Sequence, residues 1–128
     1  MPASPVTYLV DEGRKLVETT IREGFRYSDI LACFAMMRAD PRIRPDFDRV
    51  AVYEVSAAAL TSAQVREMVE SARVVPHGSG TKVAIVVPDD VTYGMMRMYE
   101  LYGGQQGTSA GVFRSRAEAD AWLRERDP

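Results

Sequence analysis

Acidic residues stand inside or directly after the apolar segments of this chain, and they are the first candidates for chemistry. Asp89 and Asp90 follow the apolar segment Val83–Val87, and Glu54 lies within Val50–Val55. Carboxylates so placed could perform acid–base catalysis or bind a metal ion. We favour simpler roles. Asp89 and Asp90 have the position of helix caps, no third metal ligand is suitably spaced, and Glu54 is expected to be a paired structural carboxylate.

Two hydroxyl residues, Thr61 and Ser62, stand at the start of an expected helix over Ser62–Arg73. Thr61 and Gln64 have the spacing of a capping box, so Thr61 is expected to cap this helix. A phosphate at this place would be stabilised by free N–H groups and by the helix dipole. Capping is the interpretation we favour, and Thr61 and Ser62 are also candidate sites of regulatory phosphorylation.

The remaining reactive residues do not form a recognisable site. Gly78–Lys82 resembles a phosphate loop in composition, but it follows an expected helix and precedes an expected strand, which is the reverse of what such loops require. His77 is the single histidine, and Cys33 has no Cys or His near it in sequence. We therefore predict no catalytic, cofactor-binding or metal site, and no cofactor.

A charged loop, Asp40–Arg49, contains two prolines. Basic and acidic residues alternate in and next to it: Arg38, Asp40, Arg42, Arg44, Asp46, Asp48 and Arg49. Mixed charges at this spacing usually form surface ion pairs of small energy. That is the expectation here, with a contact to an anion or a partner as the alternative.

The strands and helices that must position these residues can be predicted from the periodicity of the apolar residues and from the residues that end helices and form turns. Val6–Val10 and Lys15–Arg22 alternate as the two arms of a hairpin, joined by a turn in which Gly13 is expected to have positive φ. Three further strands and four helices should alternate after it, which implies a mainly parallel sheet with right-handed crossovers. The expected helices lie near 28–38, 62–73, 91–102 and 115–123, and the expected strands at 50–55, 83–87 and 110–113.

The prediction is one α/β domain over residues 1–128, with a five-stranded sheet, an N-terminal antiparallel hairpin and four helices. Ligands of such sheets gather at the carboxyl ends of the strands. The candidate ligand edge there consists of Glu54, Ser56, Asp89, Asp90 and Arg114.

Two of the expected helices carry more apolar surface than a single core-facing stripe needs. Methionine and tyrosine on such faces suit adaptable protein contacts or an apolar pocket, although a core covered on both sides is the simpler interpretation. The candidate interface residues are Cys33, Met36, Met37, Met95, Met98, Tyr99 and Tyr102.

Composition excludes several classes of function. The net charge is -2, from 16 basic and 18 acidic residues without a basic cluster, so nucleic acid is not an expected partner. The longest apolar run, Ile30–Met37, is far shorter than the roughly 20 residues that span a bilayer. The start, Met1–Pro5, lacks the features of a signal peptide. A single cysteine suggests a reducing compartment, and we expect a cytoplasmic protein.

Several segments together resemble the SpoIIAA-like family, which includes STAS domains. The likeness is strongest to small stand-alone bacterial proteins described as STAS-like or CRAL-TRIO-like. The segments that carry it are 39–46, 83–89, 96–100, 112–114 and 118–123. Regulatory STAS domains have an Asp-Ser-Ser-Gly type turn with a phosphorylated serine. The corresponding segment here, 56–63, lacks the aspartate and the glycine.

Two classes of function remain open. The resemblance implies a non-enzymatic interaction domain that self-associates or binds a protein, and the surplus apolar helix surface agrees with this. The alternative is a domain that binds a small apolar or lipid-like ligand in a cavity lined by Met and Tyr. An enzyme that uses Glu54, Asp89 and Arg114 is a third hypothesis, supported only by their place at strand ends.

Overall fold

Strands and helices alternate along a computed structural model of the chain, which describes residues 4–125. The strands are β1 (Val6–Asp11), β2 (Leu16–Ile21), β3 (Asp48–Tyr53), β4 (Lys82–Val86) and β5 (Ser109–Phe113). The helices are α1 (Tyr27–Ala39), α2 (Ser62–Ala72), α3 (Asp90–Gln105) and α4 (Arg116–Arg124). This is the predicted α/β layout.

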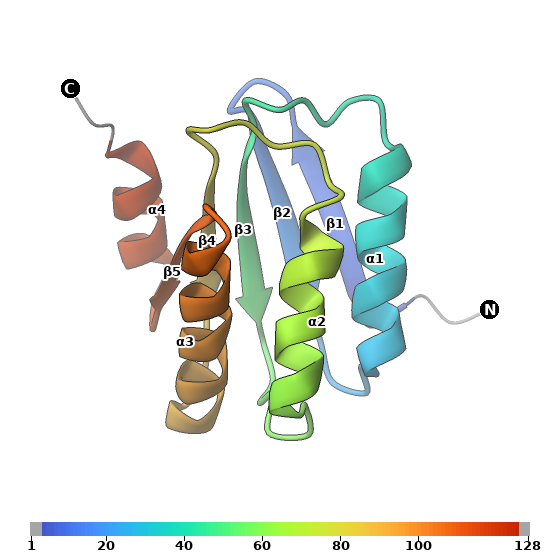
Figure 1. The fold of residues 1–128 in the computed structure, drawn as a ribbon, viewed down its shortest axis with the longest axis vertical. Helices are drawn as coiled ribbons and strands as arrows, with labels where there is room; N and C mark the ends of the chain where they lie inside the picture. Colours follow the sequence, from blue (N-terminus) through green and yellow to red (C-terminus); the bar gives the residue numbers. More distant parts are fainter. Residues whose placement is uncertain (1–3, 126–128) are drawn as a thin grey trace.

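The five strands form one sheet in the order β1-β2-β3-β4-β5 (Figure 1). β1 and β2 are antiparallel, with Val6 opposite Ile21, and every other neighbouring pair is parallel. A short turn can join antiparallel strands, whereas parallel strands need a crossover that returns the chain to the same end of the sheet. The predicted hairpin followed by helical crossovers is therefore confirmed.

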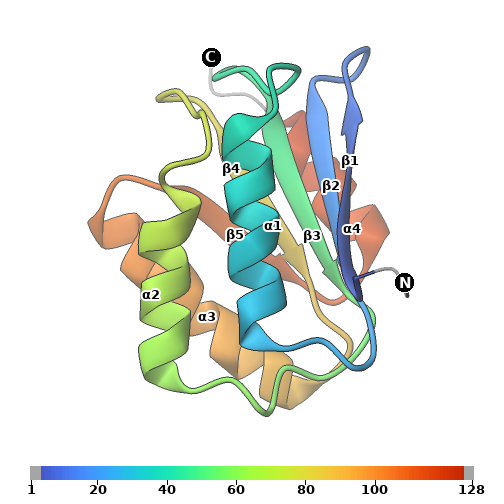
Figure 2. The same cartoon turned by 90° about the vertical axis from the view of Figure 1, so that its right-hand side faces the viewer.

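The helices are divided unequally between the two faces of the sheet. Each crossover from β2 to β5 moves one strand in the same direction, so right-handed connections place α1, α2 and α3 on one face. No strand follows α4 within residues 4–125, and it packs on the opposite face behind β3, β4 and β5 (Figures 1 and 2). The large core, between the sheet and α1–α3, therefore holds most of the buried apolar side chains.

The smaller core joins α4 to the sheet. Its buried residues are Leu16, Val50, Ala84, Val86, Ala119 and Leu123. Trp122 packs on Phe113, and Lys82 Nζ lies 4.8 Å from the centre of the Trp122 ring. Gly111 leaves room for this packing, because a Cβ there would lie 3.0 Å from the Phe113 ring.

Some predicted boundaries were wrong. β3 begins two residues earlier than predicted, so Arg49 belongs to the strand and Glu54 lies beyond it. α3 continues through Gly103 instead of stopping before it. Gly103 is needed for a close approach, because a Cβ there would lie 3.3 Å from Thr108. The chain turns instead at Gly107, whose φ is 83°.

Two turn predictions also need correction. In the β1–β2 hairpin the positive φ belongs to Lys15, at 52°, and not to Gly13. Helix α1 begins at Tyr27, so Ser28 is a helical residue and not the expected N-cap. Asp29 performs part of that role, since its carboxylate accepts a hydrogen bond from the backbone N–H of Arg26 at 2.8 Å.

Within residues 4–125 no helix has both the length and the apolar character needed to cross a membrane.

Candidate ligand-binding site

The predicted ligand edge is held together by its own side chains. Asp89 caps α3 by accepting a hydrogen bond from the backbone N–H of Thr92 at 2.8 Å. The Thr92 hydroxyl is buried and accepts the N–H of Ala57 at 2.8 Å, and it lies 3.5 Å from Ser56 Oγ. Hydrogen bonds from Thr92 hold the pKa of Asp89 below its usual value. The expected capping role of Asp89 is confirmed.

The other charges of this edge form exposed ion pairs. Arg114 Nη1 lies 2.5 Å from Asp90 Oδ1, and Arg22 Nε lies 3.8 Å from Glu54 Oε1. Glu54 is exposed at the end of β3, so its expected pairing is present but its expected place inside a strand is not. Within residues 4–125, no three His, Cys, Asp or Glu side chains are grouped so that they could hold a metal ion.

Thr61 and Ser62 have the places that the sequence predicts. Thr61 Oγ1 accepts the N–H of Gln64 at 3.1 Å, and Gln64 Oε1 accepts the N–H of Thr61 at 2.9 Å, which completes the capping box. Ser62 is exposed as the first helical residue of α2. The capping role is confirmed, and phosphorylation of either residue stays a prediction.

The glycine-rich segment that resembles a phosphate loop is anchored to its own neighbours. Gly78 N–H donates to Thr81 Oγ1, and the Thr81 hydroxyl donates to Pro45 O, each at 2.8 Å. His77 is exposed, and its Nδ1 lies 3.0 Å from Val75 O. The segment thus closes a turn before β4, as its order between helix and strand indicated.

The candidate interface residues separate into two groups. Cys33, Met37 and Tyr99 are buried in the large core, and burial raises the pKa of the Cys33 thiol to about 11. Met36 is 63% exposed on α1. The others, Met95, Met98 and Tyr102, are half-buried. The interface prediction therefore depends on Met36 and on these partly exposed side chains of α3.

A cavity of about 50 Å³ lies within the large core, between the sheet and the three helices. Strands β1 to β4 all contribute to its wall, so it extends across the strands. Much of its lining consists of sulfur-containing and aromatic side chains: Cys33, Phe34, Met37, Tyr53, Met68, Met96 and Tyr99. A single buried water needs roughly 10–15 Å³, so the cavity has room for a small molecule.

Arg49 is the most unusual residue of this cavity. It projects from β3 and is only 8% exposed, although arginine is rarely buried without a partner. Its Nη1 donates to the carbonyl oxygen of Ala72, at the end of α2, over 3.2 Å. Its Nε is buried without any hydrogen-bond partner, and no acidic side chain of residues 4–125 forms an ion pair with it.

Strand alternation explains why the neighbouring carboxylate does not neutralise Arg49. Successive side chains of a strand point to opposite faces, so Asp48 and Arg49 diverge. Asp48 Oδ1 accepts the backbone N–H of Lys82 at 2.9 Å at the start of the parallel β3–β4 pair. The prediction that Arg49 forms a surface ion pair in a charged loop was wrong, because the residue belongs to a strand and faces the core.

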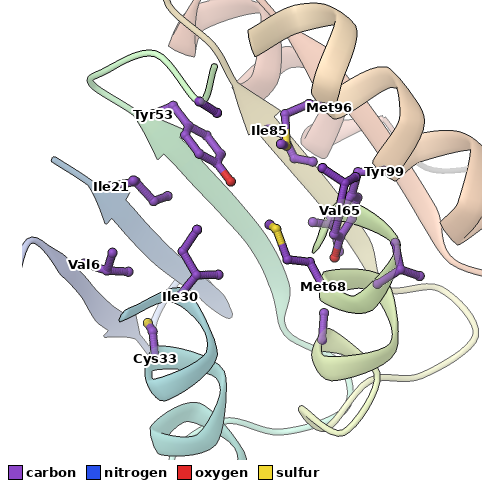
Figure 3. Packing of buried hydrophobic residues seen from close by; sticks show 14 of the residues in the cluster. Val6, Ile21, Ile30, Cys33, Tyr53, Val65, Met68, Ile85, Met96 and Tyr99 are labelled. Carbon is purple, nitrogen blue, oxygen red and sulfur yellow. The ribbon is translucent and has the colours of Figure 1, made fainter. Parts of the chain in front are cut away.

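Two buried phenols share the cavity with Arg49. Tyr53 points from β3 toward Met68 of α2, and Tyr99 reaches into the same region from α3 (Figure 3). Burial raises the pKa of both hydroxyls, and each remains a neutral group able to donate a hydrogen bond. Burial also lowers the pKa of Arg49, since a charge is unfavourable away from water.

A second, more polar pocket of about 20 Å³ adjoins the first. The two share Arg49, Val83 and Tyr99 in their walls. The second is also lined by Arg73 and by the exposed His77, near the amino end of β4. Arg49 therefore stands where an apolar cavity meets a polar pocket.

Sequence reasoning placed the candidate edge at the carboxyl ends of the strands, whereas Arg49 lies near the amino end of β3. One feature of the sequence could have identified it. When the strand is extended back to Asp48, Arg49 shares a face with Ala51 and Tyr53. A charged residue on the core face of a strand is an exception that calls for an explanation.

Comparison with known proteins found no matching family model, no matching curated protein and no matching solved structure.

Proposed function

We propose that this protein is a non-enzymatic domain that binds a small, largely apolar molecule in the cavity between the sheet and helices α1–α3. The observation that carries the proposal is the cavity of about 50 Å³, with Met and Tyr side chains in its wall. Ligand pockets are typically concave and mostly apolar, with a few polar groups that fix orientation. Arg49 and the two tyrosines supply such groups.

The volume limits the ligand. An engineered protein cavity of roughly 150 Å³ binds benzene, so this cavity suits a short, narrow molecule. Methionine side chains adapt their shape readily, and Met37, Met68 and Met96 allow some enlargement. A short unbranched chain is the shape that fits a cavity running across the strands.

Methionine methyl NMR provides the test. With 13C-methyl methionine in the protein, 1-butanol is titrated as a neutral probe. The methyl signals of Met37, Met68 and Met96 are expected to shift, because these residues line the cavity. Exposed Met36 serves as a control within the same molecule. The proposal fails if the three cavity signals stay in place or move no more than that of Met36.

A cavity-filling variant adds a second control. Ala51→Ile places extra methyl groups in the cavity from β3, and it is expected to abolish the shifts. Val52→Ile adds a methylene on the same strand but toward the opposite face, and it should leave them unchanged. Shifts that persist in Ala51→Ile would place the probe elsewhere.

A second candidate function is self-association through β1, which keeps the interaction hypothesis open. β1 is an edge strand of the sheet, and such strands offer unpaired backbone groups to another chain. Leu9 of β1 is 72% exposed on the face of the sheet away from α1. Met36 of α1 is 63% exposed on the other face, where its carbonyl oxygen lies 3.5 Å from the Tyr8 hydroxyl. A second copy could add its own β1 in antiparallel orientation.

Sedimentation equilibrium tests this second candidate. If the protein is a dimer, Leu9→Glu combined with Met36→Glu should make it monomeric. Leu101→Glu, at an apolar position on α3 that is 60% exposed, should not. A wild-type protein that remains monomeric at high concentration would rule this candidate out.

A further inference from the structure

Every charged side chain that folding buries must find a partner or lose stability. Arg49 is buried, makes one hydrogen bond to a carbonyl oxygen, and leaves Nε without a partner. A carbonyl oxygen carries no net charge, so the positive charge of Arg49 is not balanced by this contact. This unbalanced positive charge lies at the cavity, because Arg49 forms part of its wall.

We infer that the ligand of this cavity is a short-chain monocarboxylate whose carboxylate pairs with the Arg49 guanidinium and whose alkyl chain occupies the apolar part of the cavity. This inference rests on the proposed function and specifies its ligand. A carboxylate matches the planar edge of a guanidinium with two parallel hydrogen bonds, and a charged acceptor strengthens both.

The tyrosines favour the same chemistry. Tyr53 and Tyr99 retain their protons because burial raises the pKa of both hydroxyls. A neutral phenol donates a hydrogen bond to a carboxylate, whereas a second cation would bring an additional charge into the core. The polar groups of the cavity wall are thus a cation and hydrogen-bond donors, and among them there is no acidic side chain.

The other residues of the cavity wall indicate the polarity of the rest of the ligand. Away from Arg49 the cavity is bounded by apolar side chains from β1, β2 and α1, such as Val6, Ile21 and Ile30. A second charged or strongly polar group would lose its hydration there without compensation. A dicarboxylate or a phosphate therefore fits the wall less well than a carboxylate with an alkyl tail.

Matched probes test the inference. Butyrate and butyramide have similar size and shape, but only butyrate carries a charge at neutral pH. Calorimetric titration of the wild-type protein is expected to show at least about tenfold tighter binding of butyrate, which is the advantage typical of a hydrogen bond to a charged group. Inorganic phosphate, which lacks an alkyl tail, should bind more weakly than butyrate.

Three variants assign the effect to Arg49. Arg49→Met should abolish the preference for butyrate over butyramide, and Arg49→Gln should do the same while retaining hydrogen-bonding ability. Arg49→Lys keeps the charge without the planar fork and should show a reduced preference. If the methionine variant does not fold, the other two still decide the question.

The outcomes separate this inference from the proposed function. Equal affinities for butyrate and butyramide in the wild type, or a preference that persists in Arg49→Gln, would overturn the carboxylate assignment while leaving an apolar binding site. If phosphate bound more tightly than butyrate, the assignment of an alkyl tail to the ligand would be overturned. If none of the three compounds binds and 1-butanol also leaves the methionine signals unchanged, the binding site itself is refuted.

Discussion

The candidate ligand edge at the carboxyl ends of the strands, called the rim below, and the cavity around Arg49 both contain charged residues. The charged groups of the two regions differ in whether they have partners within the protein. At the rim Asp89 is bonded to Thr92, Asp90 is paired with Arg114, and Glu54 with Arg22. In the cavity the Nε of Arg49 has no hydrogen-bond partner among residues 4–125. The rim satisfies its own polar groups, and the cavity does not.

This difference shows which of the two regions is built for another molecule. Exposed ion pairs form and break in water with little change in free energy, so the rim charges need no further role. A buried unpaired charge destabilises the folded state, and proteins retain such groups mostly at functional sites. The buried guanidinium of Arg49, with its unpaired Nε, therefore indicates a binding site more strongly than the larger number of charges at the rim does.

Thr92 offers the largest effect by which to test the structural role of the rim. In Thr92→Val the buried N–H of Ala57 loses its acceptor, and the free energy of unfolding should fall by about 1–3 kcal/mol. Urea denaturation measures the change. Thr20→Val, a half-buried site on β2, is the control and should have little effect. An unchanged free energy of unfolding in Thr92→Val would mean that the rim does not depend on its internal hydrogen bonds.

Arg49 should show a change of opposite sign. Arg49→Met removes a buried charge and fills its place with an apolar side chain, so in the absence of added carboxylate the free energy of unfolding should rise by about 1 kcal/mol. The same urea experiment detects it. A loss of several kcal/mol would contradict the comparison, because Arg49 would then be holding the fold together.

The exposed ion pair between Arg114 and Asp90 should affect the free energy of unfolding less than Thr92 or Arg49 does. Arg114→Ala removes the partner of Asp90, and the free energy of unfolding is expected to change by less than about 0.5 kcal/mol. The small change that remains should shrink further in 1 M salt, because exposed charges are screened. A loss above about 1 kcal/mol that salt leaves unchanged would show that this pair is not an ordinary surface contact.

Asp89 provides a test with pH. Its pKa is lowered in the folded protein by hydrogen bonds from Thr92, so its contribution to stability is present above the unfolded value, near 4, and is lost as the pH falls through the folded value. The melting temperature of the wild type should therefore fall more between pH 5 and pH 2 than that of Asp89→Asn. Parallel curves for the two proteins would contradict the assignment.

Local sequence rules predicted the parts of the molecule that local interactions determine. The caps at Thr61 and Asp89 were predictable, because a cap needs only residues three positions apart. The order of strands and helices was predictable from periodicity, since each element must bury one face. The hairpin followed by parallel strands then left few alternative topologies.

The cavity was not predictable in the same way. Arg49 was assigned to a loop because charged residues and prolines precede it, and a shift of two residues in the start of β3 was enough to hide that it faces the core. Its lack of an acidic partner depends on Asp48 pointing to the other face and on residues from α2 and α3. Such a relation is a property of packing between distant segments, which no sequence window contains.

A crystal structure of the wild-type protein with butyrate would show whether a carboxylate pairs with Arg49. We expect density for the alkyl chain in the apolar part of the cavity and carboxylate oxygens about 3 Å from Arg49 Nε. Ordered water on Arg49 Nε, with butyrate absent from the cavity or bound only at the surface, would overturn the carboxylate assignment.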